Sequence, residues 1–374
     1  MSANVIILGS VSSGELSAIM TNYNPNETLL VFANIATMSE HQQLIDTGYS
    51  WFVRQQITHD ICKSTKNIIL VDCGMDCIRR VYDYVHPEYN YLCLLSKLLT
   101  QPIKPNRTEY IARSMFNSDI EFPLTRNGVN ILPLLTTKRV PFKSVYVELL
   151  WFLSGNTNTD FLREHGVTIW DGNTSREYLD SRGLTHFKVG DVGRAYGPQW
   201  RNFGVTGVDQ IKLLVDGLRR EPYDRRHVVT AWNPEELDQC ALPACHNLFT
   251  MVVDPPNANS NGKMILNCKV NMRSTDTFLG LPFNIASYAM LTHMIAKIID
   301  MNPGKVAISM CDVHIYTNHI EQAKEQIRRS PRKFPKLIFD PKVDKYTMLD
   351  DFGVGDIGID GYDPWPKLEG KMAV

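Results

Sequence analysis

The sequence has almost no net charge. Its 374 residues include 39 lysines and arginines against 40 aspartates and glutamates, which gives a formal charge of −1. Proteins that bind nucleic acid or an anionic membrane through their overall field carry a basic excess. We therefore expect neither nucleic acid nor a membrane as a partner.

Clustered cysteines and long apolar runs are also absent. The eight cysteines are scattered, without paired CxxC clusters, which argues against a disulfide framework. No apolar run is long enough to cross a bilayer, and the first residues lack a basic region followed by a long apolar stretch. We therefore expect reduced thiols, no metal site and a cytoplasmic protein.

The features that are present divide the chain into two parts. Between residues 1 and 100, the short apolar runs Asn4–Gly9, Thr28–Phe32 and Asn67–Asp72 alternate with helix-length stretches. This alternation predicts a small parallel-sheet α/β domain, whose role the sequence does not reveal. Prolines punctuate residues 101–106, which predicts a linker, and residues 107–374 then form a second domain.

The second part mixes helices and strands. Val145–Leu153 predicts a buried helix that stops at Gly155, and Asn284–Ile299 predicts another long apolar helix. Ile265–Met272 alternates apolar and polar residues, as a strand with one buried face does. The pattern favours an α/β (α+β) fold.

Cys245 is the candidate nucleophile. A thiol attacks carbon as a thiolate, which nearby cations or hydrogen-bond donors stabilise. His246 and the pair Arg225–Arg226 are candidates for that role. Cysteine is among the most buried residue types, however, so a Cys-His dipeptide alone favours a structural interpretation.

The surrounding residues favour a ligand site. Arg225–Arg226 precede the cysteine and Arg273–Ser274 follow it, and both pairs bring donors that bind a phosphate dianion. Asn284 lies in an apolar segment, where its amide must find partners. An amide both donates and accepts, which suits the O4 and N3–H edge of uracil, whereas an aspartate would suit cytosine. These residues indicate a nucleotide with a phosphate at one end and a pyrimidine at the other.

Ordered blocks run through the second part of the chain: Pro133–Arg139, Glu148–Phe152, Ile169–Asp171, Tyr196–Arg201, Asp224–Arg226, Ala241–His246, Arg273–Asp276, Leu279–Tyr288, Asp312–His319, Phe334–Lys336 and Met372–Val374. Through these blocks the segment from Arg107 to Val374, about seven-tenths of the chain, closely resembles the thymidylate synthase family. The family methylates dUMP at C5 with 5,10-methylenetetrahydrofolate as co-substrate. The resemblance implies a core with surrounding helices and a large mixed β-sheet at the interface of a homodimer.

The resemblance also implies a covalent mechanism. Cys245 would add to C6 of the pyrimidine, so that C5 becomes the nucleophile toward the one-carbon unit. Glu148 would run the proton transfers through water, and Tyr196 would help to remove the C5 proton. The implied catalytic residues are Cys245, Glu148, Tyr196, Asp276, Asn284 and Arg226.

The implied binding residues fall into two groups. The nucleotide contacts are Arg107, Arg273 and Ser274 for the phosphate, Arg225 and Arg226 reaching across from the other subunit, Asp276, Asn284 for the base, and His314 with Tyr316 for the 3′-hydroxyl. The folate contacts are Ile169, Trp170, Asn173, Asp276, Leu279, Gly280, Phe283 and Tyr316, with Met372 and Ala373 in a C-terminal segment that closes over the folate and excludes water.

The chain departs from the family pattern at three places. Glu109–Ala112 replaces the glycine-threonine loop that usually follows the first phosphate arginine, so Arg107 sits in a stiffer segment. Arg194 replaces a proline, as either a ligand contact or a surface cation. Met272 replaces a glutamine, and Asn271–Ser274 thereby resembles the sister enzymes that hydroxymethylate deoxypyrimidine nucleotides.

Two alternatives follow. In the first, water replaces the hydride and the product is 5-hydroxymethyl-dUMP. Trp170 and the complete terminus Met372–Val374 stand against it, because both belong to the hydride-transferring pattern that keeps water out. In the second, the core is idle and the chain acts as a scaffold through residues 1–100. The expected catalytic side chains are all present, which disfavours that interpretation.

Overall fold

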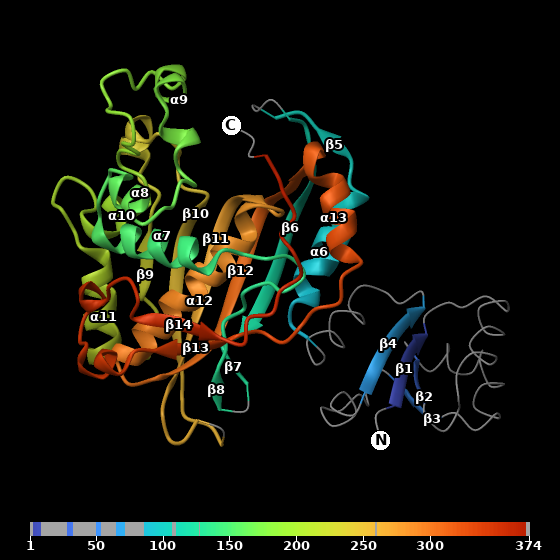
Figure 1. The fold of residues 1–374 in the computed structure, drawn as a ribbon. Helices are drawn as coiled ribbons and strands as arrows, with labels where there is room; N and C mark the ends of the chain where they lie inside the picture. Colours follow the sequence, from blue (N-terminus) through green and yellow to red (C-terminus); the bar gives the residue numbers. More distant parts are fainter. Residues whose placement is uncertain are drawn as a thin grey trace. The chain divides into compact units, whose positions relative to one another are not determined.

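The computed structural model describes residues 86–371, except 107–109, 127 and 259, and the backbone of four strands nearer the N-terminus (Figure 1). The chain divides into two compact units, Met1–Cys93 and Leu94–Val374. In the described part of the chain, every helix is too short or too polar to span a bilayer.

The described part of the first unit contains a parallel sheet. β1 (Ala3–Leu8), β2 (Thr28–Phe32), β3 (Ser50–Val53) and β4 (Thr65–Val71) pair in the order β3-β2-β1-β4. Three of these strands, β1, β2 and β4, coincide with the apolar runs found in the sequence. The helices expected between them lie outside the described residues, so the N-terminal α/β domain and its role stay predictions.

A six-stranded mixed sheet forms the centre of the second unit. Its order is β5 (Ile103–Lys104), β6 (Ala112–Pro123), β12 (Asn302–Tyr316), β11 (Ile265–Asp276), β10 (His246–Asp254) and β9 (Val228–Thr230). Only β11 and β12 pair in parallel among these strands; the other neighbours are antiparallel. The predicted strand Ile265–Met272 is confirmed, and it continues to Asp276.

One face of this sheet is covered by helices. α12 (Gly280–Ile298) packs on β11 and β12, and α7 (Phe142–Ser154) packs against both α12 and α10 (Tyr196–Arg201). Both predicted helices are thus confirmed. Nearly all of α12 is buried, as expected for a helix that is apolar on all sides. α7 ends at Gly155, whose φ of 70° suits glycine and whose N–H donates to the Phe152 carbonyl.

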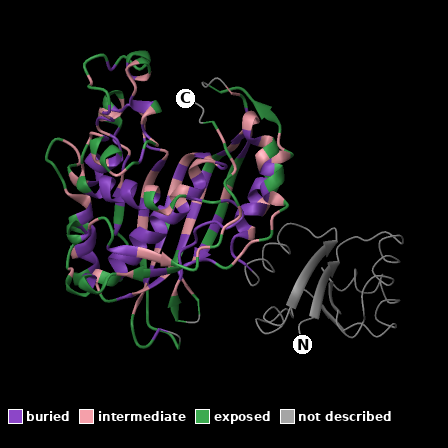
Figure 2. Ribbon diagram, in the orientation of Figure 1, coloured by how far each residue is buried: buried purple, intermediate pink, exposed green. Residues whose placement is uncertain are grey.

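The opposite face of the sheet is open in the single chain. Alternate residues point to opposite faces of a strand, so the exposed side chains between buried neighbours mark this face. Val252 is 50% exposed, and Lys269 is also exposed, each between buried neighbours. Figure 2 shows the buried residues concentrated along α7, α12 and the central strands.

Further elements surround the core. The helices are α8 (Asp160–Glu164), α9 (Arg176–Ser181), α11 (Gln210–Arg220) and α13 (Ile320–Ile327). Two small antiparallel sheets have two strands each: β7 (Thr125–Arg126) pairs with β8 (Val129–Asn130), and β13 (Lys336–Phe339) pairs with β14 (Ile357–Asp360).

The division between the units differs from the predicted linker at 101–106. It falls inside α6 (Tyr89–Leu99), whose residues Leu94, Leu95 and Leu98 are buried. Within the predicted linker, β5 pairs with β6. This two-residue strand could not be predicted from the sequence. Prolines flank it, which favours a linker, and a strand so short shows no alternation of apolar and polar residues.

Candidate active site

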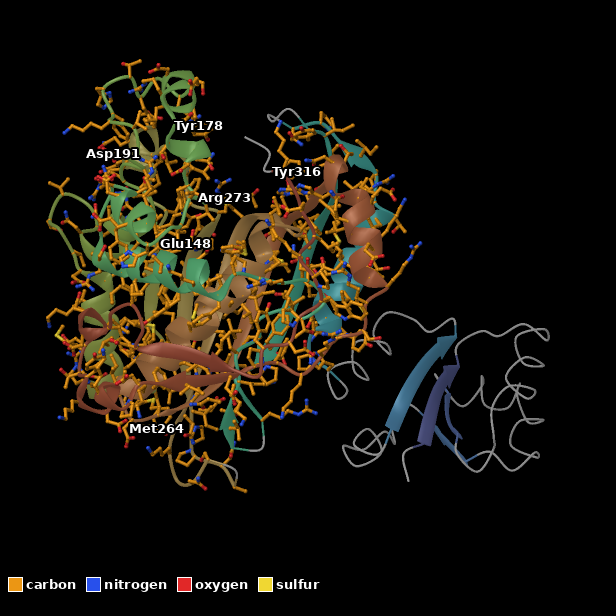
Figure 3. All side chains as sticks on the ribbon, in the orientation of Figure 1. Glu148, Tyr178, Asp191, Met264, Arg273 and Tyr316 are labelled. Atoms are coloured by element: carbon orange, nitrogen blue, oxygen red, sulfur yellow. The ribbon has the colours of Figure 1, made fainter. Side chains whose placement is uncertain are left out.

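A cavity of about 800 Å³ opens at the C-terminal ends of β11 and β12 and beside α7, α10 and the N-terminus of α12. Glu148, Arg273 and Tyr316, labelled in Figure 3, come from α7, β11 and β12. The cavity brings together these predicted residues: Glu148, Ile169, Trp170, Asn173, Tyr196, Cys245, Arg273, Ser274, Asp276, Leu279, Gly280, Phe283, Asn284, His314 and Tyr316.

Cys245 lies immediately before β10 and beside a cation. The guanidinium Nη2 of Arg273 is 4.0 Å from the Cys245 sulfur. The same guanidinium donates to the carbonyl oxygens of Ala244 at 2.8 Å and Pro243 at 2.7 Å, which fixes it against the turn that carries the cysteine. Because carbonyl oxygens do not neutralise it, its positive charge remains available to stabilise a thiolate.

Tyr196 supports the cysteine from the other side. The backbone N–H of Cys245 donates to the Tyr196 hydroxyl oxygen at 2.8 Å. Burial raises the pKa of Tyr196 well above its usual value, and the neighbouring Cys245 raises it further. Tyr196 is therefore a neutral phenol that holds the cysteine backbone and still presents its O–H to the cavity.

His246 does not serve as a cation. Its ring is buried, stacks on the Tyr196 ring at 4.1 Å between centroids, and its Nδ1 lies 2.7 Å from the Tyr288 hydroxyl. Burial lowers the pKa of His246 to about 3. The candidate role of His246 as a positive partner for the thiolate is therefore wrong, because a buried imidazole of this pKa is neutral at physiological pH.

Glu148 is a buried carboxyl on the wall of the cavity. The indole N–H of Trp170 donates to its Oε1 at 2.7 Å. Burial raises the pKa of Glu148 to about 7, and the hydrogen bond from Trp170 opposes the shift. A carboxyl with this pKa takes up and releases protons near neutral pH.

Asp276 organises the start of α12. Its Oδ1 accepts from the backbone N–H groups of Phe278 at 3.0 Å and Leu279 at 3.2 Å. Lys138, which sequence reasoning missed, donates to the Phe278 carbonyl and lies 3.7 Å above the Phe278 ring. Burial lowers the pKa of Lys138 to about 7, and Asp276 opposes this. Lys138 belongs to a block that carried the family resemblance, which was the available signal.

The far end of the cavity contains His314 and Tyr316, whose ring centroids are 5.1 Å apart. Asp312 and Ser114 join them there and were also missed. The Ser114 hydroxyl donates to Asp312 Oδ1 at 2.6 Å, and His314 Nδ1 is 3.6 Å from the same oxygen.

Some predicted residues are not in this cavity. Arg225 and Arg226 lie on an exposed turn, where Arg226 pairs with Asp224 at 2.7 Å. They do not line the cavity of their own chain. Arg107, Met372 and Ala373 lie outside the described residues.

The structure describes two of the residues that depart from the family pattern, Arg194 and Met272. Arg194 is not part of the cavity wall; it forms an ion pair with Glu236 at 3.1 Å. Met272 is buried on β11 and contributes to the cavity wall. Among the described residues, His, Cys, Asp and Glu form no cluster of three or more that could hold a metal ion.

Comparisons with known proteins show which family the chain resembles. The thymidylate synthase family model matches residues 89–374. The chain is 44% identical over 301 residues to thymidylate synthase of Saccharomyces cerevisiae, covering 77% of this chain and 97% of that enzyme. It is 41% identical over 310 residues to thymidylate synthase of Candida albicans, covering 77% of this chain and 98% of the relative.

A longer relative gives a similar match. The bifunctional dihydrofolate reductase-thymidylate synthase of Zea mays is 42% identical over 308 residues, which is 79% of this chain and 56% of that protein. The chain thus spans about half the length of this bifunctional relative. None of these matches supports the hydroxymethylase or the scaffold alternative. The chain belongs to the thymidylate synthase family.

Proposed function

We propose that this chain converts dUMP to dTMP by reductive methylation at C5, with 5,10-methylenetetrahydrofolate as co-substrate. The observation that carries the proposal is the Cys245 sulfur, 4.0 Å from the Arg273 guanidinium at the wall of a large cavity. Family membership supports the same activity.

Cys245 is the proposed nucleophile at C6 of uracil. Arg273 stabilises its thiolate electrostatically, and Tyr196 holds its backbone N–H. Addition at C6 places a negative charge on the C5–C4–O4 system of the ring. Covalent addition thereby makes C5 a nucleophile, which the uncharged uracil ring is not.

Proton transfer falls to Glu148 and Tyr196. Because the pKa of Glu148 is about 7, this carboxyl both donates to and accepts from a water on the ring face at physiological pH. Tyr196 supplies a neutral O–H near C5, which suits it to passing the C5 proton on rather than retaining it.

The nucleotide is held at both ends. Arg273 and Ser274 bind its phosphate, and the amide of Asn284 pairs with the O4 and N3–H edge of the base. His314 and Tyr316 bind the 3′-hydroxyl, and Asp276 belongs to the same wall. Arg107 is a further phosphate ligand in this proposal.

The remaining wall fits a folate. Trp170, Leu279 and Phe283 give flat apolar surface, and Ile169 and Asn173 flank it. A Cβ at Gly280 would meet only the Asp276 and Asn284 side chains, at 3.7 and 4.0 Å, so the backbone there presents open space to a ligand. When bound, the folate supplies the one-carbon unit and the hydride. The segment that includes Met372 and Ala373 closes this part of the site.

A homodimer completes the site in this proposal. The open face of the six-stranded sheet, on which Val252 is 50% exposed and Lys269 is also exposed, is a surface that a second copy would cover. The side chain of Arg226 is 84% exposed and does not line its own cavity, which suits donation of Arg225 and Arg226 to the site of the partner subunit.

A cytoplasmic location stays a prediction from the cysteine content.

Product analysis tests the proposed reaction. The purified protein is mixed with dUMP and 5,10-methylenetetrahydrofolate, the nucleotides are separated by chromatography, and the folates are followed by absorbance. We expect dTMP and dihydrofolate in equal amounts. Release of tetrahydrofolate with 5-hydroxymethyl-dUMP would contradict the proposal, as would unchanged dUMP.

A further inference from the structure

We propose that Arg194 is a positioning residue for the proposed reaction: its ion pair with Glu236 fixes α10, and with it the Tyr196 hydroxyl, against the segment that carries Cys245. The inference rests on the proposed function, because its effect is on the rate of that chemistry. Arg194 itself does not line the cavity.

Arg194 contacts both ends of α10. It lies two residues before Tyr196, the first residue of the helix, and its carbonyl oxygen accepts from the Gln199 side chain at 2.8 Å. At the other end, its Nη2 donates to the carbonyl oxygen of Asn202 at 2.6 Å. The planar guanidinium makes this second contact while Nε bonds to Glu236 at 3.1 Å.

Glu236 connects the helix to the loop before the nucleophile. It lies in a short 3₁₀ helix, Pro234–Gln239, and its Oε2 accepts from Arg194, from Gln199 at 2.8 Å and from Asn233 at 2.9 Å. The side chains of Arg194 and Glu236 are 20% and 18% exposed. Such a pair is less screened by water than an exposed one, so its geometry is better fixed.

The same two segments meet again at the reacting group. Tyr196 is the first residue of α10, and its hydroxyl oxygen accepts from the Cys245 backbone N–H at 2.8 Å. Between the two contacts, the Ala241 N–H donates to Val192 at 3.1 Å. The two segments thus stay in contact from the Arg194–Glu236 ion pair to Tyr196 and Cys245. The ion pair at one end of this contact therefore helps to fix the distance between the Tyr196 hydroxyl and Cys245.

The Arg194–Glu236 ion pair occupies a position where the family usually has a proline. The family's usual proline would fix φ at position 194 without any side-chain contact. Here the backbone N–H of Arg194 donates to the Gln239 carbonyl at 2.9 Å, which a proline does not allow. Where the family's usual proline would restrict the backbone, Arg194 instead makes an ion pair with Glu236 and hydrogen bonds at both ends of α10.

The test measures kcat, KM for dUMP and the melting temperature of Arg194→Ala, Arg194→Lys and wild type. Arg194→Ala should lower kcat about tenfold or more, because displacements on the order of 1 Å near a reacting group cost up to about 10²-fold. KM for dUMP should stay unchanged, since Arg273 and Ser274 are not on α10. Arg194→Lys should recover part of kcat, because an ammonium pairs with Glu236 but does not also reach Asn202.

Lys342→Ala is the matched control. It removes a cation 2.6 Å from Asp356, a carboxylate that keeps two other donors, just as Glu236 keeps Gln199 and Asn233. Lys342 is not part of the cavity wall. Its removal should lower the melting temperature and leave kcat unchanged.

The outcomes separate the possibilities. A loss of kcat in Arg194→Ala alone, with partial recovery in Arg194→Lys, supports the proposal. Wild-type kcat in folded Arg194→Ala, or an equal loss in Lys342→Ala, overturns it. If Arg194→Ala does not fold, Glu236→Gln removes only the charge, and wild-type kcat in that variant overturns the proposal. An inactive wild type would instead overturn the proposed function.

Discussion

The Arg273 guanidinium contacts the Cys245 sulfur and also donates to two carbonyl oxygens of the turn before Cys245. In the proposed mechanism, this arrangement makes Cys245 the reactive centre of the cavity. Cys245→Ser should lower turnover by on the order of 10⁴-fold or more, as for other catalytic nucleophiles, because the serine hydroxyl remains protonated. Turnover is measured by dTMP formation and nucleotide binding by titration calorimetry.

Binding is the control for that variant. The phosphate and base contacts assigned to Arg273, Ser274 and Asn284 are unchanged in Cys245→Ser, so dUMP should bind with nearly wild-type affinity. Substantial dTMP formation by this variant would remove Cys245 from the mechanism.

The burial of Glu148 should make the free energy of unfolding depend on pH. Its pKa is about 7 in the folded chain against 4.5 in its ordinary state, because of burial, although the Trp170 hydrogen bond opposes the shift. The folded state therefore holds this proton more tightly than the unfolded state, and the contribution of Glu148 to wild-type stability falls as pH rises from about 4.5 to about 7. Glu148→Gln has no such titration and still accepts from Trp170.

The measurement is urea unfolding of both proteins across this pH range. The stability of Glu148→Gln relative to wild type should increase with pH by up to about 3 kcal/mol, and it should level off above pH 7. Dehydration of a carboxylate is the physical reason. A difference that does not change with pH would show that Glu148 is not buried in the folded protein.

Several site residues could be predicted from sequence because they lie in continuous blocks. Cys245, Glu148 and Tyr196 all line the cavity as expected. The role of Lys138 could not be predicted, because it depends on the Phe278 carbonyl and ring, 140 residues further along the chain. The neutrality of His246 likewise depends on burial between side chains that are distant in sequence.

At the scale of elements, α10 approaches α7 unusually closely. A Cβ on Gly197 would lie 2.7 Å from the carbonyl oxygen of Phe152, a backbone atom that cannot swing away. Gly197→Ala should therefore destabilise the chain by about 1–3 kcal/mol, even though alanine is intrinsically the better helix former. Urea unfolding measures this change.

Gly358→Ala is the matched control for this contact. Gly358 lies in β14, and a Cβ there meets nothing within 4 Å. That variant should keep wild-type stability or gain slightly. Equal stabilities for the two variants would mean that α10 and α7 are not in the contact described.

Element boundaries were less predictable than the elements themselves. The apolar segments gave α7, α12 and β11 correctly, because burial on one or all sides leaves a strong pattern. The boundary between the units falls inside α6 rather than at the predicted linker, and β5 lies within that linker, because both depend on partners: the buried leucines of α6 and the pairing of β5 with β6. Periodicity within a segment carries no information about either.

The whole molecule, in the proposed dimer, shares its site between two subunits. A mixture of Cys245→Ser and Arg226→Ala chains tests this. Each variant alone should be nearly inactive. After joint unfolding and refolding, random pairing leaves about a quarter of the sites with both an intact cysteine and an intact arginine, so activity should return toward that fraction. No recovery would mean that Arg226 serves its own chain.

At this scale the family resemblance predicted the mixed sheet and its helices, and the second unit has both. Composition alone could not have done so, because near-neutral charge and ordinary apolar content fit many folds. The open face of the sheet became visible only in three dimensions, since its exposed residues alternate with buried ones on strands far apart in sequence.

The covalent bond between Cys245 and C6 of the uracil ring is tested most directly by trapping it. In 5-fluoro-dUMP the C5 hydrogen is replaced by fluorine, which cannot leave as a cation, so the reaction stops with the enzyme still bound to its ligands. The protein is incubated with this nucleotide and 5,10-methylenetetrahydrofolate, digested and analysed by mass spectrometry. The account predicts added mass from nucleotide and folate on the peptide that contains Cys245. Added mass on another cysteine, such as the exposed Cys311, or no added mass at all, would contradict it.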